Sequence, residues 1–280
     1  MQLILDVENL VKEFPSKGNK KNGIPRAIDD ISFQVFEGEA LGLVGESGSG
    51  KSTTARCILH LLKPTSGRVS FQGENVLEMD KSELKSFRKD AQVIFQDPYS
   101  SLDPRMKVGD IIGEGIQIHN PKISKQALQN EVTEMMELVG LRPDHFNRFP
   151  RAFSGGERQR IGIARALAVK PKFLICDEPV ASLDVSIQAQ ILNLLQKMKE
   201  EFGLTILFIA HDLATVRHLC TRIAVMESGK IREIGDRSQI YENPQHPYTQ
   251  SLIAIVPEPD PISERERLVE RKLSKLKERS

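Results

Sequence analysis

The sequence is poor in cysteine, tryptophan and long apolar runs, and each absence excludes a class of protein. Its three cysteines (Cys57, Cys176, Cys220) lie far apart among 280 residues, so we expect neither a disulfide framework nor a cysteine metal site. The longest apolar run, residues 204–210, has the length of a buried strand and is far below the roughly 20 residues of a membrane span. Acidic residues within the first ten positions argue against a signal peptide. We therefore expect a cytosolic protein that meets a membrane only through partners.

Charge is also nearly balanced, with 39 lysines and arginines against 38 acidic residues and a net charge of +1. This balance provides no overall field to attract nucleic acid or an anionic lipid surface. Basic stretches at 17–26 and in the C-terminal tail contain turn formers or interspersed acids, which favours a solvated surface. No nucleic-acid partner is predicted.

Hydrophobic patterning predicts an α/β fold with a mostly parallel sheet covered on both faces, because short apolar strands alternate with helical patterns. The predicted strands span 3–14, 27–45, 66–73, 91–98, 172–178 and 204–210, followed by a short strand pair within 223–235. The predicted helices span 51–62, 157–169 and 187–202, the last with Gly203 as its C-cap, and a further helix follows Asp212.

Two segments depart from this alternation. Residues 98–150 have weak helical periodicity, clearest at 125–139, and look like a small helical subdomain inserted into the core. Beyond residue 260, Val269, Leu273 and Leu276 share one helical face after a capping box of Ser263 and Glu266. A packing or docking helix is the favoured interpretation of this tail, with disorder as the alternative.

The stretch "GESGSGKS" at 45–52 matches the G-x-x-x-x-G-K-[ST] phosphate loop between a predicted strand and a predicted helix. Its backbone N–H groups would surround the α- and β-phosphates, Lys51 would reach the β- and γ-phosphates, and Ser52 would bind Mg²⁺. The loop predicts a nucleoside triphosphate as ligand.

The strand "FLICDEP" at 173–179 delivers two adjacent carboxylates to its C-terminal end, where open α/β sheets bind ligands. Successive strand residues point in opposite directions, so two roles are expected. Asp177 suits Mg²⁺, and Glu178 suits activation of the attacking water. Acids simply exposed at a loop are the less favoured alternative.

Gln96 and His211 each follow a predicted strand. The Gln96 amide could reach Mg²⁺ or the attacking water, and the His211 imidazole could donate to a γ-phosphate. Taken alone, each is more typical of an ordinary structural side chain. Their assignment depends on the other motifs.

A second candidate phosphate site is "AFSGGERQR" at 152–160, where Ser154 could cap a helix whose N-terminal N–H groups attract anions. A carboxylate at Glu157 would repel a phosphate if it faced inward. We therefore expect Glu157 to turn aside, toward Arg158, Arg160 or its own helix N-terminus.

The motifs "GESGSGKS", "FQD", "SGGERQR", "LICDEP", "SLD" and "HD" together resemble those of ATP-binding cassette (ABC) ATPases in order and spacing, over nearly the whole chain. The resemblance implies the ABC-type P-loop NTPase fold, with an antiparallel β subdomain and an inserted helical subdomain at about 98–158. It implies Gln96, Glu178 and His211 as catalytic residues and Ser52, Gln96 and Asp177 as Mg²⁺ ligands. The implied ATP-binding residues are Phe14, which would stack on adenine, and Gly45, Glu46, Ser47, Gly48, Ser49, Gly50, Lys51, Ser52, Thr53, Gln96, Ser154, Gly155, Gly156, Glu157, Asp184 and His211. Two such chains pair head to tail, so "SGGE" would complete the partner's ATP site.

The segments 95–115 and 241–261 resemble those of oligopeptide/dipeptide importer ATPases, which divides the chain into an ATP-binding domain at 1–240 and an extension at 241–280. This resemblance implies ATP-driven peptide import at the cytoplasmic face of the membrane. The implied partners are a second ATPase chain in a heterodimer, two permease subunits contacted through residues near 96–115, and indirectly an external binding protein. Nickel, glutathione or another small solute as cargo, or a soluble ATPase without a transporter, remain as alternatives.

Overall fold

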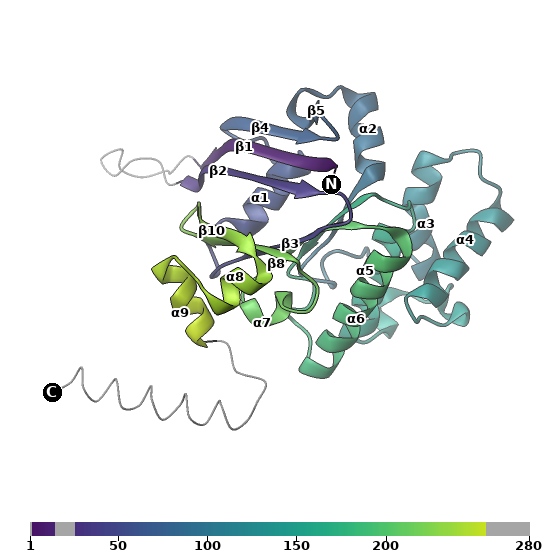
Figure 1. The fold of residues 1–280 in the computed structure, drawn as a ribbon. Coiled ribbons are helices and arrows are strands. Elements are labelled where there is room, and N and C mark those ends of the chain that lie inside the picture. Colours follow the sequence, from purple (N-terminus) through teal and green to yellow (C-terminus); the bar gives the residue numbers. More distant parts are fainter. Residues whose placement is uncertain (1, 15–25, 256–280) are drawn as a thin grey trace.

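The computed structural model describes residues 2–14 and 26–255, whose strands form two sheets (Figure 1). The antiparallel sheet contains, in spatial order, β2 (Arg26–Phe36), β1 (Leu3–Glu13), β4 (Ser66–Phe71) and β5 (Glu74–Asn75). The second sheet contains β10 (Lys230–Asp236), β9 (Arg222–Glu227), β3 (Ala40–Val44), β8 (Thr205–Ala210), β7 (Phe173–Asp177) and β6 (Ala91–Ile94). Strands β9 to β6 are parallel and β10 pairs antiparallel with β9, so the predicted mostly parallel core is confirmed.

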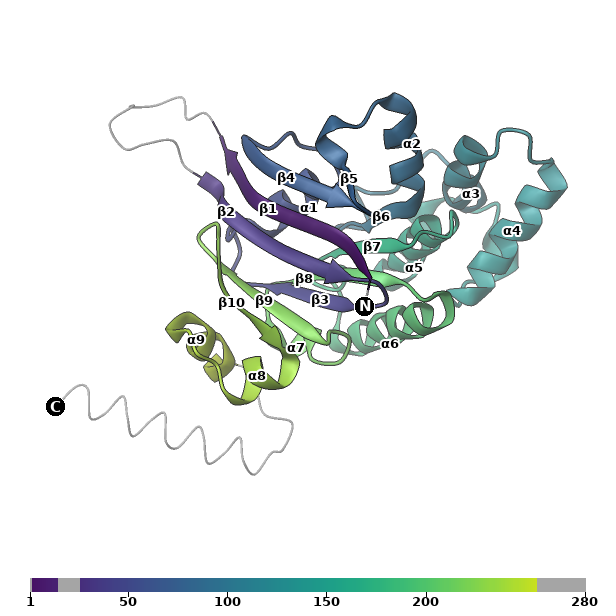
Figure 2. The same cartoon turned by 45° about the horizontal axis from the view of Figure 1, so that its top comes forward.

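The helices fall into a group near the second sheet and a group that projects from it (Figures 1 and 2). The first group contains α1 (Lys51–Ile58), α2 (Lys81–Asp90), α5 (Gly155–Leu167), α6 (Val185–Phe202) and α7 (Leu213–Val216). The second contains α3 (Val108–His119) and α4 (Lys125–Leu138), which lie at one end of the molecule. Helices α8 (Arg237–Glu242) and α9 (Pro247–Ile255) follow β10 at the other end.

Alternation along the parallel strands creates one core on each face of the second sheet. In β7, Phe173 and Ile175 enter the cluster shared with the antiparallel sheet and α1, whereas Leu174 and Cys176 enter the cluster under α5 and α6. All four side chains are fully buried. Both faces are therefore apolar, which is why these strands read as continuous hydrophobic runs.

The strand character predicted over 27–45 is confirmed, but the segment holds two strands, because the chain turns between Phe36 and Ala40 and enters the other sheet. Gly38 has φ +72° in this turn and its N–H donates to Thr205 Oγ1 at 3.0 Å. Glu39, which is buried, accepts hydrogen bonds from Phe36 N at 2.8 Å and Arg222 Nη1 at 2.9 Å. This carboxylate therefore fastens the two sheets together.

Other predicted elements are close to the observed ones. Helix α6 ends at Gly203 with φ +63°, as predicted, and Ser154 caps α5. The helix predicted at 51–62 ends earlier, at Ile58, and the helix after Asp212 has a single turn. The tail helix predicted beyond residue 260 lies outside the described residues. Among the described residues, no helix is both long and apolar enough to cross a bilayer.

Candidate nucleotide site

The phosphate loop connects β3 to α1 and leaves the first amides of this helix accessible. Gly50 is the N-cap of α1 with φ +108°, and a Cβ at this position would lie 2.2 Å from the Ala27 carbonyl oxygen. No side chain caps the helix and no acidic residue lies in its first turn. The uncapped N–H groups and the helix dipole therefore favour an anion here, as a triphosphate requires.

Lys51 lies inside this loop and is only 3% exposed. Its Nζ donates to the carbonyl oxygens of Gly45 at 2.6 Å and Glu46 at 2.9 Å. Burial lowers the pKa of Lys51, while the nearby Glu178 and Asp177 carboxylates oppose this shift. The ammonium group is therefore held within the loop by carbonyl oxygens, with which phosphate oxygens would compete.

Ser52 and Asp177 form a pair of oxygen donors beside Lys51. Ser52 Oγ donates to Asp177 Oδ1 at 2.8 Å, across 125 residues of sequence. Burial raises the pKa of Asp177, and the hydrogen bond from Ser52 opposes this. A hydroxyl and a carboxylate suit Mg²⁺, which usually takes one or two protein oxygens together with substrate phosphates and waters. Among the described residues, no three or more His, Cys, Asp or Glu side chains gather in a group that could hold a metal ion.

The three side chains predicted to be catalytic meet at the Glu178 carboxylate. Gln96 Nε2 donates to Glu178 Oε2 at 2.9 Å, and His211 Nδ1 lies 3.9 Å from the same oxygen. Lys51 Nζ lies 3.8 Å from the other oxygen. Glu178 has φ +48°, a left-handed conformation that costs energy for a non-glycine residue, and its N–H donates to Ile209 O at 3.0 Å. This arrangement places a carboxylate that can act as a general base beside an amide and an imidazole.

Glu157 turns back on the N-terminus of its own helix, one of the three orientations predicted for it. Its Oε2 accepts hydrogen bonds from Ser154 N at 2.9 Å and Ser154 Oγ at 2.8 Å. The Ser154 backbone N–H and hydroxyl lower the pKa of Glu157. Arg158 instead donates to Pro150 O and Arg160 to Val139 O, so neither arginine pairs with this carboxylate.

Some predicted site residues lie apart from the phosphate loop. Within the described residues, no hydrogen bond or ion pair joins Ser154, Glu157 or Asp184 to that loop, and Asp184 caps α6 by accepting from Ile187 N. Phe14 is 42% exposed at the end of β1, with Lys12 Nζ 5.1 Å from its ring centroid. Its stacking on adenine stays a prediction.

One contact to the phosphate loop was not predicted. The Tyr248 hydroxyl, on α9, accepts the Glu46 N–H at 3.2 Å. Tyr248 lies within the 241–261 segment, which sequence reasoning used only to distinguish classes of transporter. A tyrosine in the first turn of a short apolar helix carries no signal of its partner 202 residues away.

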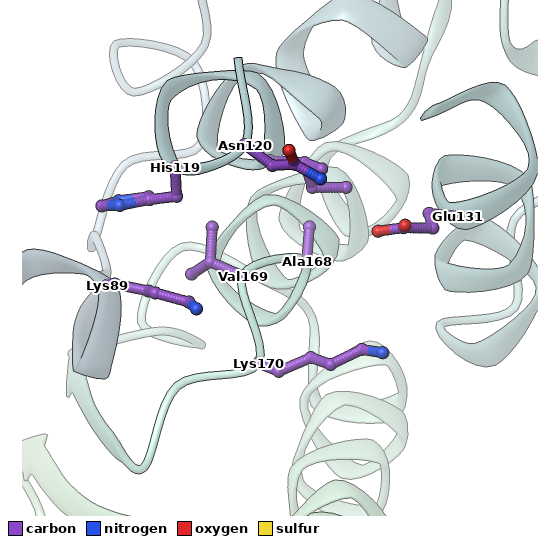
Figure 3. A pocket seen from close by; sticks show the side chains of 8 residues that line it. Lys89, His119, Asn120, Glu131, Ala168, Val169 and Lys170 are labelled. Carbon is purple, nitrogen blue, oxygen red and sulfur yellow. The ribbon is translucent and has the colours of Figure 1, made fainter. Parts of the chain in front are cut away.

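A separate pocket of about 160 Å³ lies where the ends of α2, α3 and α5 approach α4 (Figure 3). Its polar side chains include Lys89, His119, Glu131 and Lys170, which lie around Ala168 and Val169. Burial and the neighbouring Lys85 and Lys89 lower the pKa of His119. None of the predicted site residues lines this pocket, so it is not part of the nucleotide site.

Known families match both parts of this arrangement. The ABC transporter family matches residues 28–181, and the family described as "Oligopeptide/dipeptide transporter, C-terminal region" matches residues 232–279. The oligopeptide transport ATP-binding protein OppF of Streptococcus mutans is 54% identical over 95% of this chain and 85% of its own. The chain belongs to the oligopeptide/dipeptide ABC transporter ATP-binding family.

Further relatives agree with this membership. The dipeptide transport ATP-binding protein DppF of Lactococcus lactis is 50% identical over 94% of this chain and 84% of its own. A solved dimeric ATP-binding cassette, described as a post-hydrolysis state with ADP and phosphate, is 28% identical with a TM-score of 0.75 and covers 84% of this chain and 99% of its own. The fold is thus the ABC-type P-loop NTPase fold, as predicted, and the protein is an ATPase that binds adenine nucleotide.

Proposed function

We propose that this ATPase energises the import of di- or oligopeptides through partner permease subunits. The observation that carries the proposal is the match of residues 232–279 to the oligopeptide/dipeptide C-terminal region, together with the peptide-transport relatives. An ATPase subunit does not touch cargo, so these likenesses, and not any cavity of this chain, support peptide as the substrate class.

In the proposed reaction Glu178 accepts a proton from the attacking water, and His211 and Gln96 orient the reacting groups. Their convergence on one carboxylate supports these roles. Mg²⁺, held by Ser52, Asp177 and Gln96, would neutralise phosphate charge. Lys51, the other residues of 45–53 and Phe14 would bind ATP, while Ser154 to Glu157 and Asp184 would act across the dimer.

The proposed assembly is a head-to-tail pair with a second ATPase chain, attached to two permeases at the cytoplasmic face of the membrane. The solved dimeric cassette supports pairing, and the separation of Ser154 from the phosphate loop of its own chain agrees with it. Residues 1–240, with a helical insertion at about 98–158, would form the ATPase domain, and 241–280 the extension. Closure of the pair would reach the permeases through residues near 96–115.

Reconstitution tests this function. The chain, a second ATPase, two permeases and an external binding protein would be placed in liposomes, and uptake of a labelled tripeptide measured with ATP and with ADP. ATP-dependent peptide uptake is expected. Uptake of nickel or glutathione without peptide would contradict the cargo, and ATP hydrolysis unaffected by permeases and binding protein would favour a soluble ATPase.

A further inference from the structure

The peptide unit that joins Gly45 to Glu46 in the phosphate loop is held from two sides. Its carbonyl oxygen, that of Gly45, faces the interior of the loop and accepts a hydrogen bond from Lys51 Nζ at 2.6 Å. Its N–H faces the other way and donates to the Tyr248 hydroxyl at 3.2 Å. The first contact comes from the loop itself, whereas the second comes from the family-specific C-terminal region.

Nucleotide binding would affect the Lys51 contact and the Tyr248 contact differently. Lys51 must leave the Gly45 and Glu46 carbonyl oxygens if its ammonium group is to reach phosphate oxygens. Tyr248 lies outside the loop and has no such competing partner among the described contacts. It therefore remains to fix this peptide unit once Lys51 has moved.

Tyr248 is itself held firmly to the second sheet. Glu233 on β10 accepts hydrogen bonds from Gln245 N at 2.9 Å and His246 N at 3.0 Å, and His246 Nδ1 accepts from Tyr248 N at 3.1 Å. The next residue, Thr249, is fully buried. Strand β10 pairs with β9, and Gly229, in the turn between them, donates to Ser49 O at 2.9 Å. The extension and the β9–β10 hairpin therefore contact the same loop.

We propose that Tyr248 is a positioning residue for the phosphate loop, through which the C-terminal extension sets the affinity of this chain for ATP. The proposal rests on the proposed site residues but not on the identity of the cargo. It assigns to the start of α9 a function in nucleotide binding, separate from any contact with permeases.

The test compares Tyr248→Phe with Gln250→Ala in the full chain. Tyr248→Phe keeps the ring and removes the hydroxyl. The side chain of Gln250, on the same helix, donates to Pro244 O within the extension, so Gln250→Ala perturbs α9 without touching the loop. The dissociation constant of a fluorescent ATP analogue with Mg²⁺ is measured for each, together with the melting temperature without nucleotide. In the assembled transporter, KM for ATP and kcat are measured.

Loss of one neutral hydrogen bond is expected to weaken ATP binding by about three- to ten-fold in Tyr248→Phe. KM should rise by a similar factor with kcat unchanged, and Gln250→Ala should match the wild type. An unchanged dissociation constant in Tyr248→Phe would overturn the proposal, and so would an equal loss in both variants. Failure of the wild-type chain to bind the analogue, or of the transporter to move peptide, would instead contradict the proposed function.

Discussion

The Glu157 carboxylate accepts both the backbone N–H and the hydroxyl proton of Ser154, so the serine that would face a partner's ATP is turned toward its own helix. Because the hydroxyl has a single proton, it cannot donate to this carboxylate and to a γ-phosphate at once. ATP-driven pairing would have to break this bond.

Glu157→Gln should therefore strengthen ATP-driven pairing while weakening the helix cap. The neutral amide removes repulsion toward the triphosphate, so the ATP concentration for half-maximal hydrolysis by the assembled transporter should fall several-fold. Loss of the charged cap should lower the free energy of unfolding by about 0.5–1 kcal/mol. Urea unfolding and steady-state kinetics check the two effects, and a higher half-maximal ATP concentration would contradict the first.

Glu178→Gln should bind ATP and hydrolyse it about 10²–10⁴-fold more slowly, because an amide cannot take the proton of the attacking water. Nucleotide binding and phosphate release in the assembled transporter measure the two steps. Glu201→Gln on the exposed face of α6, where Glu201 pairs with Lys197, is the matched control and should be unaffected. Near-normal turnover in Glu178→Gln would remove Glu178 from the role of base.

Asp177→Asn should abolish the gain in ATP affinity that Mg²⁺ provides, because the amide loses the charge that pairs with the ion next to Ser52. Binding measured with Mg²⁺ and with a chelator should differ for the wild type and coincide for the variant. Asp144→Asn, an exposed partner of Arg142, is the control. A full Mg²⁺ effect in Asp177→Asn would place the ion elsewhere.

Arg222→Ala should destabilise the fold by about 1–3 kcal/mol, because it leaves the buried Glu39 carboxylate without its cationic partner. Arg142→Ala removes an exposed ion pair with Asp144 and should cost less than about 1 kcal/mol. Chemical denaturation of both variants provides the comparison. If both variants lost the same free energy of unfolding, the buried Glu39–Arg222 pair would contribute no more to stability than an exposed ion pair.

The cysteines should resist alkylation in the native protein. All three are buried, and burial raises the pKa of Cys57 to about 11 and the pKa values of Cys176 and Cys220 further. At pH 8 the reactive thiolate is therefore scarce, and it becomes accessible only after unfolding. Labelling followed by mass spectrometry, with and without urea, measures this, and rapid native labelling of Cys57 would show that α1 opens.

The sequence predicted the fold class and indicated the candidate site residues, but not every element of the scaffold. Local patterns indicated Lys51, Asp177 and Glu178, because a phosphate loop and a pair of acids at the end of a strand each have a specific sequence pattern. The split of the strand at 27–45 was missed because both halves are apolar and the turn at Gly38 is short. Helix α2 was also missed, although Asp80 and Glu83 form a capping box that could have indicated it.

Contacts between distant segments were beyond the reach of local patterns. Ser52 with Asp177 was implied by their shared ligand, and Gln96 with Glu178 by the family resemblance. The contact of Tyr248 with Glu46 was implied neither by a shared ligand nor by the resemblance. A single tyrosine hydroxyl and a backbone N–H leave no periodicity or spacing in the sequence to detect. Such a contact depends on where the sheet places β10, which is a property of the whole fold.

The hydrogen bonds that Glu39 makes to both sheets also affect how parts of the protein can move relative to one another. With the turn at Gly38 tied to Thr205 and Glu39 tied to Arg222, the two sheets form a single stiff body that carries the phosphate loop. Helices α3 and α4 contribute no strand to this body but pack against it through α5, and their buried side chains join the core cluster on that face of the second sheet. We expect the exchange of nucleotide to rotate residues 95–154 as a unit relative to the two sheets. The rate of amide hydrogen exchange should change first near residues 95 and 154, where this segment joins the rest of the chain, and last within β3 and β8.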